Sequence, residues 1–170
     1  MNAMKRLCRG LDLISECTGR IVSWLIVPLT VLILFEILTR RFLGKPTIWT
    51  FEISKFIYAG HFMLAIGYTL LYKAHVSVDA ITVHLSPRTQ AILNIITYII
   101  FLFLFAAVII WQGTIFAATS WKLRETSWSV FHPPLYPIKT VMPITGGLLL
   151  LQGISDFIKN IIFLVKGKRI

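Results

Sequence analysis

Long apolar segments separated by short polar connections dominate the chain. Four of them are each long enough to cross the hydrocarbon core of a bilayer, which needs ~20 helical residues. We predict membrane-spanning helices at about 18–40, 48–72, 90–121 and 135–165. The third segment has no charged residue from Ala91 to Trp121 and is longer than one crossing requires, so its helix must tilt or project from the bilayer. The pattern predicts an all-α membrane protein with a single four-span domain over residues 1–170.

Two shorter stretches have the pattern of segments that lie in the membrane interface. In residues 1–16, apolar side chains recur at helical spacing and basic side chains lie off that stripe, which predicts an amphipathic helix resting on anionic phospholipid. Residues 73–87, between the second and third spans, are too polar to span and too apolar for a free loop. Their alternation leaves helix and strand open. An unpaired strand is costly in the interface, so we favour a short interfacial helix that ends before Pro87.

Composition and charge support the membrane class. Of the 170 residues, 56% are hydrophobic and only 14% are charged. A formal net charge of +10 could indicate nucleic acid, but the basic residues cluster before the first apolar segment and after the last, which is a topology signal. We therefore expect no nucleic-acid partner, and a bacterial inner-membrane location with both termini in the cytoplasm. The first apolar segment ends in charged residues rather than a small-residue cleavage site, so we expect it to be retained.

No motif of an enzyme is present. The chain has no glycine-rich phosphate loop, no nucleophile elbow and only seven acidic residues, so we expect no catalytic site. His61 and His75 are fourteen residues apart and could place haem ligands, but we favour a packed, hydrogen-bonded His61 and a helix-end His75. Cys8 and Cys17 lack metal-ligand spacing and should be free thiols. We expect neither cofactor nor metal in this chain.

Three pairs of opposite charges can close on a helix surface. They are Glu36 with Arg40, Glu52 with Lys55, and Asp156 with Lys159. All lie near predicted helix ends, where snorkelling lowers the cost of a charge, so they can be local interfacial pairs. Alternatively, one member can reach a partner helix or an ion path. Glu36 also suggests a small proton-coupled exporter, although Arg40 lies one turn away and a proton carrier should be deep and unpaired.

Small residues and prolines indicate where helices approach one another or bend. Gly60 and Gly67 are seven residues apart and share a helix face, and Gly146 has a glycine at the same spacing after it. These faces suit a bundle core and a contact between subunits about equally well. Pro28 and Pro143 should bend their helices.

Two stretches of the chain resemble a known family. R-R-F-L-G-K-P-T-I-W-T-F-E (Arg40 to Glu52) and G-Y-T-L-L-Y-K-A-H-V-S-V-D (Gly67 to Asp79) are similar to the small membrane subunit of tripartite ATP-independent periplasmic (TRAP) transporters. The matching residues are Arg41, Phe42, Pro46, Trp49, Glu52, Gly67, His75, Val76, Asp79, Pro143 and Gly146. Phe51 stands where the family often has the first of two acids, and Lys55 stands where it commonly has arginine.

The resemblance implies an accessory scaffold subunit of a sodium-coupled carrier. A larger membrane subunit would hold the substrate and sodium sites, and a periplasmic substrate-binding protein would deliver an organic acid or related solute. The candidate interface or structural residues are Glu36, Arg40, Arg41, Trp49, Glu52, Lys55, Gly60, Gly67, His75, Asp79, Pro143 and Gly146. We expect the second helix to be anchored near Trp49 and Glu52, and the cytoplasmic connection to be fixed by His75 and Asp79. The alternatives are a four-helix haem anchor of a redox complex and a small proton-coupled exporter.

Overall fold

The computed structural model describes residues 2–72 and 85–167, and these residues are almost entirely helical. The elements are α1 (Asn2–Ser23), α2 (Ile26–Leu43), α3 (Ile48–Leu64), α4 (Ile66–Leu71), α6 (Pro87–Thr97), the π-helix η1 (Tyr98–Leu102), α7 (Phe103–Leu123) and α8 (Tyr136–Lys166). The only extended pairing in the described ranges is an isolated bridge between Thr126 and Pro134. The all-α prediction is therefore confirmed. The predicted interfacial helix between spans 2 and 3 lies almost wholly outside the described residues.

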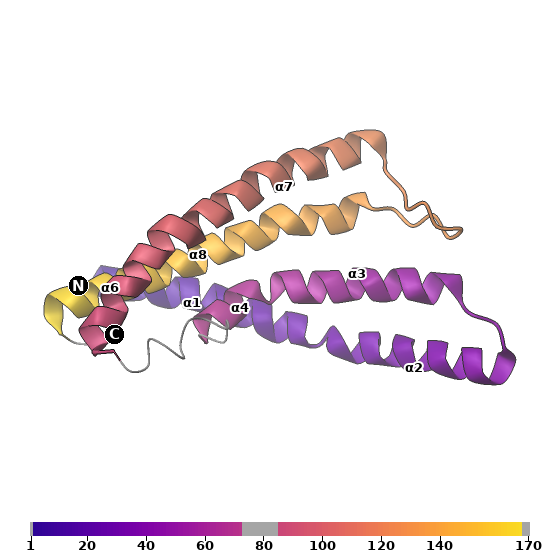
Figure 1. Ribbon diagram of the computed structural model, residues 1–170, viewed down its shortest axis with the longest axis horizontal. Helices are drawn as coiled ribbons and strands as arrows, with labels where there is room; N and C mark the ends of the chain where they lie inside the picture. Colours follow the sequence, from indigo (N-terminus) through magenta and orange to yellow (C-terminus); the bar gives the residue numbers. More distant parts are fainter. Residues whose placement is uncertain (1, 73–84, 168–170) are drawn as a thin grey trace.

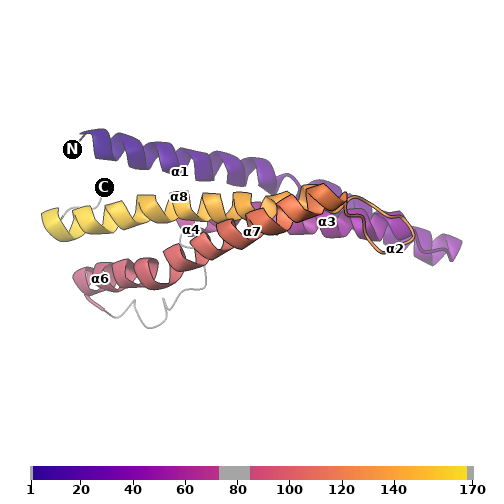
Figure 2. The same cartoon turned by 90° about the horizontal axis from the view of Figure 1, so that it is seen from above.

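The helices form two hairpins. α2 pairs with α3 and α7 pairs with α8, and the two pairs separate toward the end that carries the connections 44–47 and 124–135, here called the loop end (Figure 1). Both termini lie at the opposite end, the terminal end. α8 is central because α1, α3, α4, α6 and α7 all pack against it. Figure 2 shows α1 and α6 on opposite sides of α8.

α1 and α2 form one long helical stretch that is interrupted at Trp24 and Leu25. Proline has no backbone N–H and its ring crowds the carbonyl four residues earlier, so Pro28 disturbs the turn at Trp24. The Trp24 carbonyl instead accepts from the N–H of Val27 at 3.2 Å. The expected effect of Pro28 on its helix is therefore confirmed. The expected boundary between an interfacial helix at 1–16 and a span from about 18 is not seen, because no proline stops α1 before Ser23.

Among the described residues, three stretches are long and apolar enough to cross a membrane. They are Met4–Leu43, Pro87–Leu123 and Tyr136–Lys166. The predicted second span is instead divided at Ala65 into α3, of 17 residues, and the short α4. The division is slight, because the N–H of Ala65 still donates to the carbonyl of His61 at 3.1 Å. It lies next to a close contact, where a Cβ placed on Gly67 would be 3.3 Å from the hydroxyl oxygen of Ser15.

The predicted third span is a single helical stretch with a π-helical turn inside it. Ser86 caps its start by accepting from the N–H of Thr89 at 3.3 Å, and Pro87 occupies the first turn, where its missing N–H costs nothing. The 37 residues extend about 55 Å at 1.5 Å per residue. This exceeds a hydrocarbon core of ~30 Å, so the helix is too long for one perpendicular crossing.

Small and polar side chains fill much of the interior. The largest fully buried side chains are Gln152, Thr50, Ser15, Ser120 and Ser155. α2, by contrast, buries only Leu29 and exposes most of its other large apolar side chains. Glycines bring the helices together: a Cβ on Gly146 of α8 would lie 2.8 Å from the side chain of Ile110 on α7. The glycine faces therefore serve contacts inside the chain, as in membrane bundles generally.

Candidate functional site

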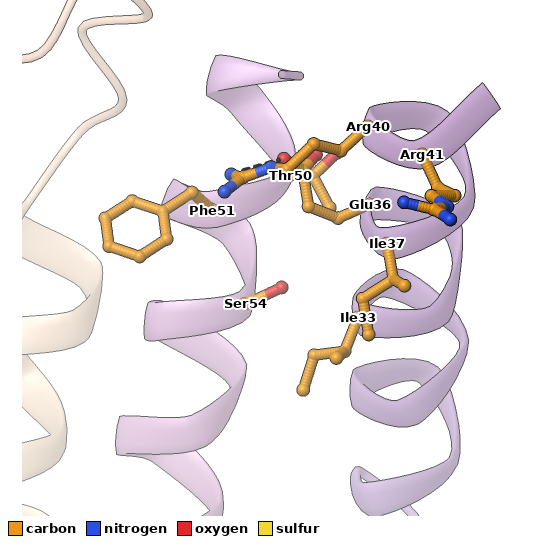
Figure 3. Close-up of a pocket in the computed structure, with 8 residues that line it drawn as sticks. All are labelled: Ile33, Glu36, Ile37, Arg40, Arg41, Thr50, Phe51 and Ser54. Atoms are coloured by element: carbon orange, nitrogen blue, oxygen red, sulfur yellow. Dashed lines mark hydrogen bonds and ion pairs between the residues drawn. The ribbon is translucent and has the colours of Figure 1, made fainter. Parts of the chain in front are cut away.

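Glu36 joins the last turns of α2 to the connection that leads into α3. Its Oε1 accepts from Arg40 at 3.0 Å, the pair that the spacing predicts. Its Oε2 accepts from the backbone N–H of Thr47 at 3.1 Å and from the Thr47 hydroxyl. Glu36 and Arg40 meet between the two helices in Figure 3. With these partners and a position near the helix end, Glu36 lacks the features of a deep, unpaired proton carrier.

Glu52 is buried at the loop end and faces the connection between α7 and α8. Its residue is only 5% exposed. Lys55 donates to Oε1 at 3.0 Å, as the spacing predicts, and the Ser127 hydroxyl lies 3.5 Å from Oε2. The ammonium of Lys55 also lies 4.8 Å from the centre of the Phe51 ring. Glu52 therefore points into its own bundle and links the two hairpins.

The connection 124–135 is held in a defined shape. The N–H of Leu135 donates to the carbonyl of Glu125 at 2.9 Å, and the Glu125 carboxylate pairs with Lys139 of α8. The hydrogen bond from Lys139 holds the pKa of Glu125 below its ordinary value. The side chain of Trp128 is 98% exposed on this connection. A fixed loop thus presents an aromatic side chain at the loop end.

Trp49 and Arg41 lie at the same end. The Trp49 ring packs against Phe35 of α2, with 5.9 Å between the ring centroids. Arg41 is exposed in the last turn of α2 and makes no hydrogen bond or ion pair with any described residue. The loop end therefore combines an interfacial tryptophan with an available guanidinium.

A polar cluster at the terminal end joins α1 to α8. Asp12 Oδ1 accepts from Ser155 at 2.7 Å, from Lys159 at 2.8 Å and from Gln152 at 3.2 Å. Lys159 also donates to Asp156 at 3.1 Å, the third pair that the spacing predicts. The sequence does carry part of this signal, because these α8 residues recur every three or four positions and share one helix face. Their partner is 140 to 147 positions away, beyond any local pattern.

The histidines of the described residues make ordinary hydrogen bonds. His61 Nδ1 lies 2.9 Å from the carbonyl oxygen of Val22, which confirms the interpretation of His61 as a packed, hydrogen-bonded residue. His132 Nδ1 lies 2.9 Å from the carbonyl oxygen of Ser127. No group of three His, Cys, Asp or Glu side chains that could hold a metal occurs among the described residues.

The remaining candidate residues fall into two groups. Gly60, Gly67 and Gly146 are buried, and Gly67 and Gly146 lie at close contacts, whereas a Cβ on Gly60 would meet Ile138 at an ordinary 3.8 Å. Pro143 of α8 packs against Gly113 of α7, where a Cβ on Gly113 would lie 3.1 Å from the Pro143 nitrogen. His75 and Asp79, expected in the cytoplasmic connection, lie outside the described residues. The structure thus brings Glu36, Glu52 and their partners to one end, and places the glycines along the helix contacts.

Long apolar helices with close glycine contacts define a multi-pass membrane protein. Residues 29–162 match the family described as "Tripartite ATP-independent periplasmic transporters, DctQ component". This match covers most of the chain, and the chain belongs to that family as the small membrane subunit of a TRAP transporter. The family is one of transporter components rather than enzymes. No curated protein and no solved structure shows significant similarity to the chain.

Proposed function

We propose that the chain is an accessory scaffold of a sodium-coupled TRAP transporter that takes up organic acids or related solutes. The observation that carries this proposal is that the chain uses two carboxylates, the buried Glu52 and the half-buried Asp12, to join its own helices. Glu52 links α3 to the connection before α8, and Asp12 links α1 to α8. A carrier that works alone typically has unwound helices whose free backbone groups bind solute and ion near the middle of the membrane. The division at Ala65 keeps its backbone hydrogen bond to His61 and offers no such site.

The proposed partners are a larger membrane subunit, which holds the substrate and sodium sites, and a periplasmic substrate-binding protein. Membership of the family supports both partners. The outward face of the α2–α3 hairpin supports the first, because α2 packs mainly against α3 and buries only Leu29. An apolar helix with so little buried surface in its own chain leaves room for lipid and for another membrane helix.

We place α3 and α4 together as a fourth span in the bacterial inner membrane. The 24 residues from Ile48 to Leu71 extend about 36 Å at 1.5 Å per residue, enough for a core of ~30 Å. An even number of crossings agrees with the common position of both termini in Figure 1. The terminal end carries the larger share of basic residues, so it would face the cytoplasm.

α1 continues α2 and packs along α8, so its exposed face would lie where this part of the molecule meets the cytoplasmic headgroups. Its exposed face carries Leu7 and Ile14 together with the exposed Arg6 and Arg9. The opposite face carries Asp12 and packs on α8. Apolar side chains beside arginines suit the headgroup region of an anionic phospholipid surface.

Reconstitution tests this function. Vesicles would contain the large membrane subunit from the same source and be supplied with its substrate-binding protein, with or without this chain. We expect solute uptake only when all three proteins are present and an inward sodium gradient is imposed. Solute flux through vesicles that contain this chain alone would support the exporter instead. A Soret absorption band in the purified chain would support the haem anchor.

A further inference from the structure

An open groove of about 600 Å³ lies between α2 and α3 at the loop end. Its lining residues are Ile33, Glu36, Ile37, Arg40, Arg41, Thr50, Phe51 and Ser54. In Figure 3, Ser54 points from α3 into the space between the helices, and Arg40 reaches from α2 toward α3 at the edge of that space. The groove is therefore apolar along α2 and basic where α2 ends.

The basic edge has hydrogen-bonding capacity to spare. The side chain of Arg40 is 68% exposed although one of its nitrogens bonds to Glu36. Arg41 makes no hydrogen bond or ion pair with any described residue. Glu36, the one acid of the lining, is already engaged by Arg40 and Thr47. Two arginines against one glutamate leave a net charge of +1, and free guanidinium N–H groups bind phosphate well.

The apolar part of the groove runs along the axis of α2, in the direction that an acyl chain takes beside a membrane helix. Ile33 and Ile37 lie one turn apart, and Ile33 is about 10 Å from Arg40 along the helix axis at 1.5 Å per residue. An apolar membrane helix laid in this groove would offer no anion to the guanidinium of Arg41. An empty groove would leave its walls without contacts. A hydrocarbon chain can enter such a space and restore them.

We propose that this groove binds one phospholipid with an anionic, phosphate-bearing headgroup. Arg40 and Arg41 hold the phosphate, and one acyl chain lies along Ile33 and Ile37. The site is at the opposite end of the molecule from the α1 face described above. It does not depend on the proposed scaffold function, because its residues all come from this chain.

Native mass spectrometry of the purified full-length chain, titrated with phosphatidylglycerol in detergent, tests the headgroup. We expect one phosphatidylglycerol to be retained in preference to phosphatidylcholine. Arg40→Gln combined with Arg41→Gln should lower the apparent affinity by about fivefold for each arginine removed. Lys122→Gln removes an exposed charge at the same end but outside the groove, and should keep the wild-type affinity. Equal affinities for the two lipids, or equal effects of the two sets of variants, would overturn the proposal.

A second variant tests the proposed acyl-chain site and leaves both arginines in place. It tests lipid binding even if the double arginine variant does not fold. Ile37→Trp should fill the groove and reduce phosphatidylglycerol retention, whereas Ile115→Trp, on an exposed face of α7, should not. Ser54→Cys provides a further readout in the assembled transporter. Crosslinking of this cysteine to a photoactivatable phosphatidylglycerol is expected. Crosslinking to a helix of another subunit instead would show that a protein occupies the groove and would refute the lipid site.

Discussion

Individual polar side chains in this protein mainly hold its own helices in place. Asp12 is the clearest case, since one carboxylate oxygen accepts hydrogen bonds from three side chains of α8. Within a membrane bundle such bonds typically contribute ~0.6–2 kcal/mol each. Glu52 acts similarly at the loop end, where its partners are Lys55 and Ser127.

Replacing Asp12 tests the cluster. Asp12→Asn removes the charge that Lys159 meets at 2.8 Å and should lower the stability by about 1–3 kcal/mol. Glu16→Gln is the matched control on the same helix. It removes only an exposed pair with Arg20, whose side chain is 73% exposed, and should cost less than ~1 kcal/mol. Thermal unfolding in detergent, followed by circular dichroism, measures both. Equal losses would show that the cluster contributes no more than a surface pair.

The pairing of Glu125 with Lys139 predicts a pH dependence. Because the pKa of Glu125 is lowered in the folded protein, mainly by its hydrogen bond from Lys139, its stabilising contribution is present above the ordinary carboxyl pKa. The contribution disappears as the pH falls through the lowered value. The difference in melting temperature between wild type and Glu125→Gln should thus be constant near neutral pH and vanish in acid. A difference that grows as the pH falls would contradict the assignment.

Local sequence spacing was sufficient for the pairs within one helix and insufficient for contacts between helices. Glu36 with Arg40 and Glu52 with Lys55 form as their spacing predicts. The contact of Asp12 with Lys159 joins distant parts of the chain, and no periodicity encodes it. The partner of Glu52 on the connection 124–135 was likewise hidden, because it depends on how two hairpins meet.

At the scale of elements, α7 and α8 illustrate how glycine controls packing. A Cβ on Gly146 would lie 2.8 Å from Ile110 and 2.9 Å from Ile109, closer than side chains tolerate. The neighbouring Gly147 has nothing within 4 Å of a Cβ. The two adjacent glycines thus have different roles on the same helix.

Alanine at these two positions should separate the roles. Gly146→Ala should force α7 and α8 apart and cost about 1–3 kcal/mol, as overpacking typically does. Gly147→Ala should be neutral or stabilising by up to about 1 kcal/mol, because alanine favours a helix over glycine. Thermal unfolding of the two variants side by side provides the comparison. If Gly147→Ala proved the more damaging, the assigned helix contact would be incorrect.

The lengths of the apolar segments predicted where the helices lie. They did not predict every point at which a helix is interrupted. The effect of Pro28 was predictable because proline removes a backbone donor. The π-helical turn Tyr98–Leu102 and the division at Ala65 were not, since no proline lies in either place. The division at Ala65 accompanies the close approach of α4 to α1 near Gly67, which only the assembled bundle reveals.

At the scale of the molecule, the sequence identified the family more readily than the arrangement. The stretch from Arg40 to Asp79 suggested the small TRAP subunit, and the match over residues 29–162 confirms it. The central position of α8, and the packing of α1 along it, depend on long-range contacts that composition and hydropathy do not contain.

The proposed topology predicts which cysteines react from each side of the membrane. Cys17 is exposed on α1, before the interruption at Trp24, and Trp128→Cys would place a thiol on the exposed loop. In intact spheroplasts an impermeant maleimide should label Trp128→Cys in a background without the native cysteines. Cys17 should react only after the membrane is opened. Labelling of both thiols in intact spheroplasts would exclude an even number of crossings with cytoplasmic termini.

The composition of the complex purified through a tag on this chain tests the scaffold function most directly. After extraction in mild detergent, we predict a much larger polytopic membrane protein in constant proportion to the tagged chain. The same preparation should show no Soret band. Repeated recovery of the tagged chain as a lone monomer, under conditions in which its fold is intact by circular dichroism, would contradict the account.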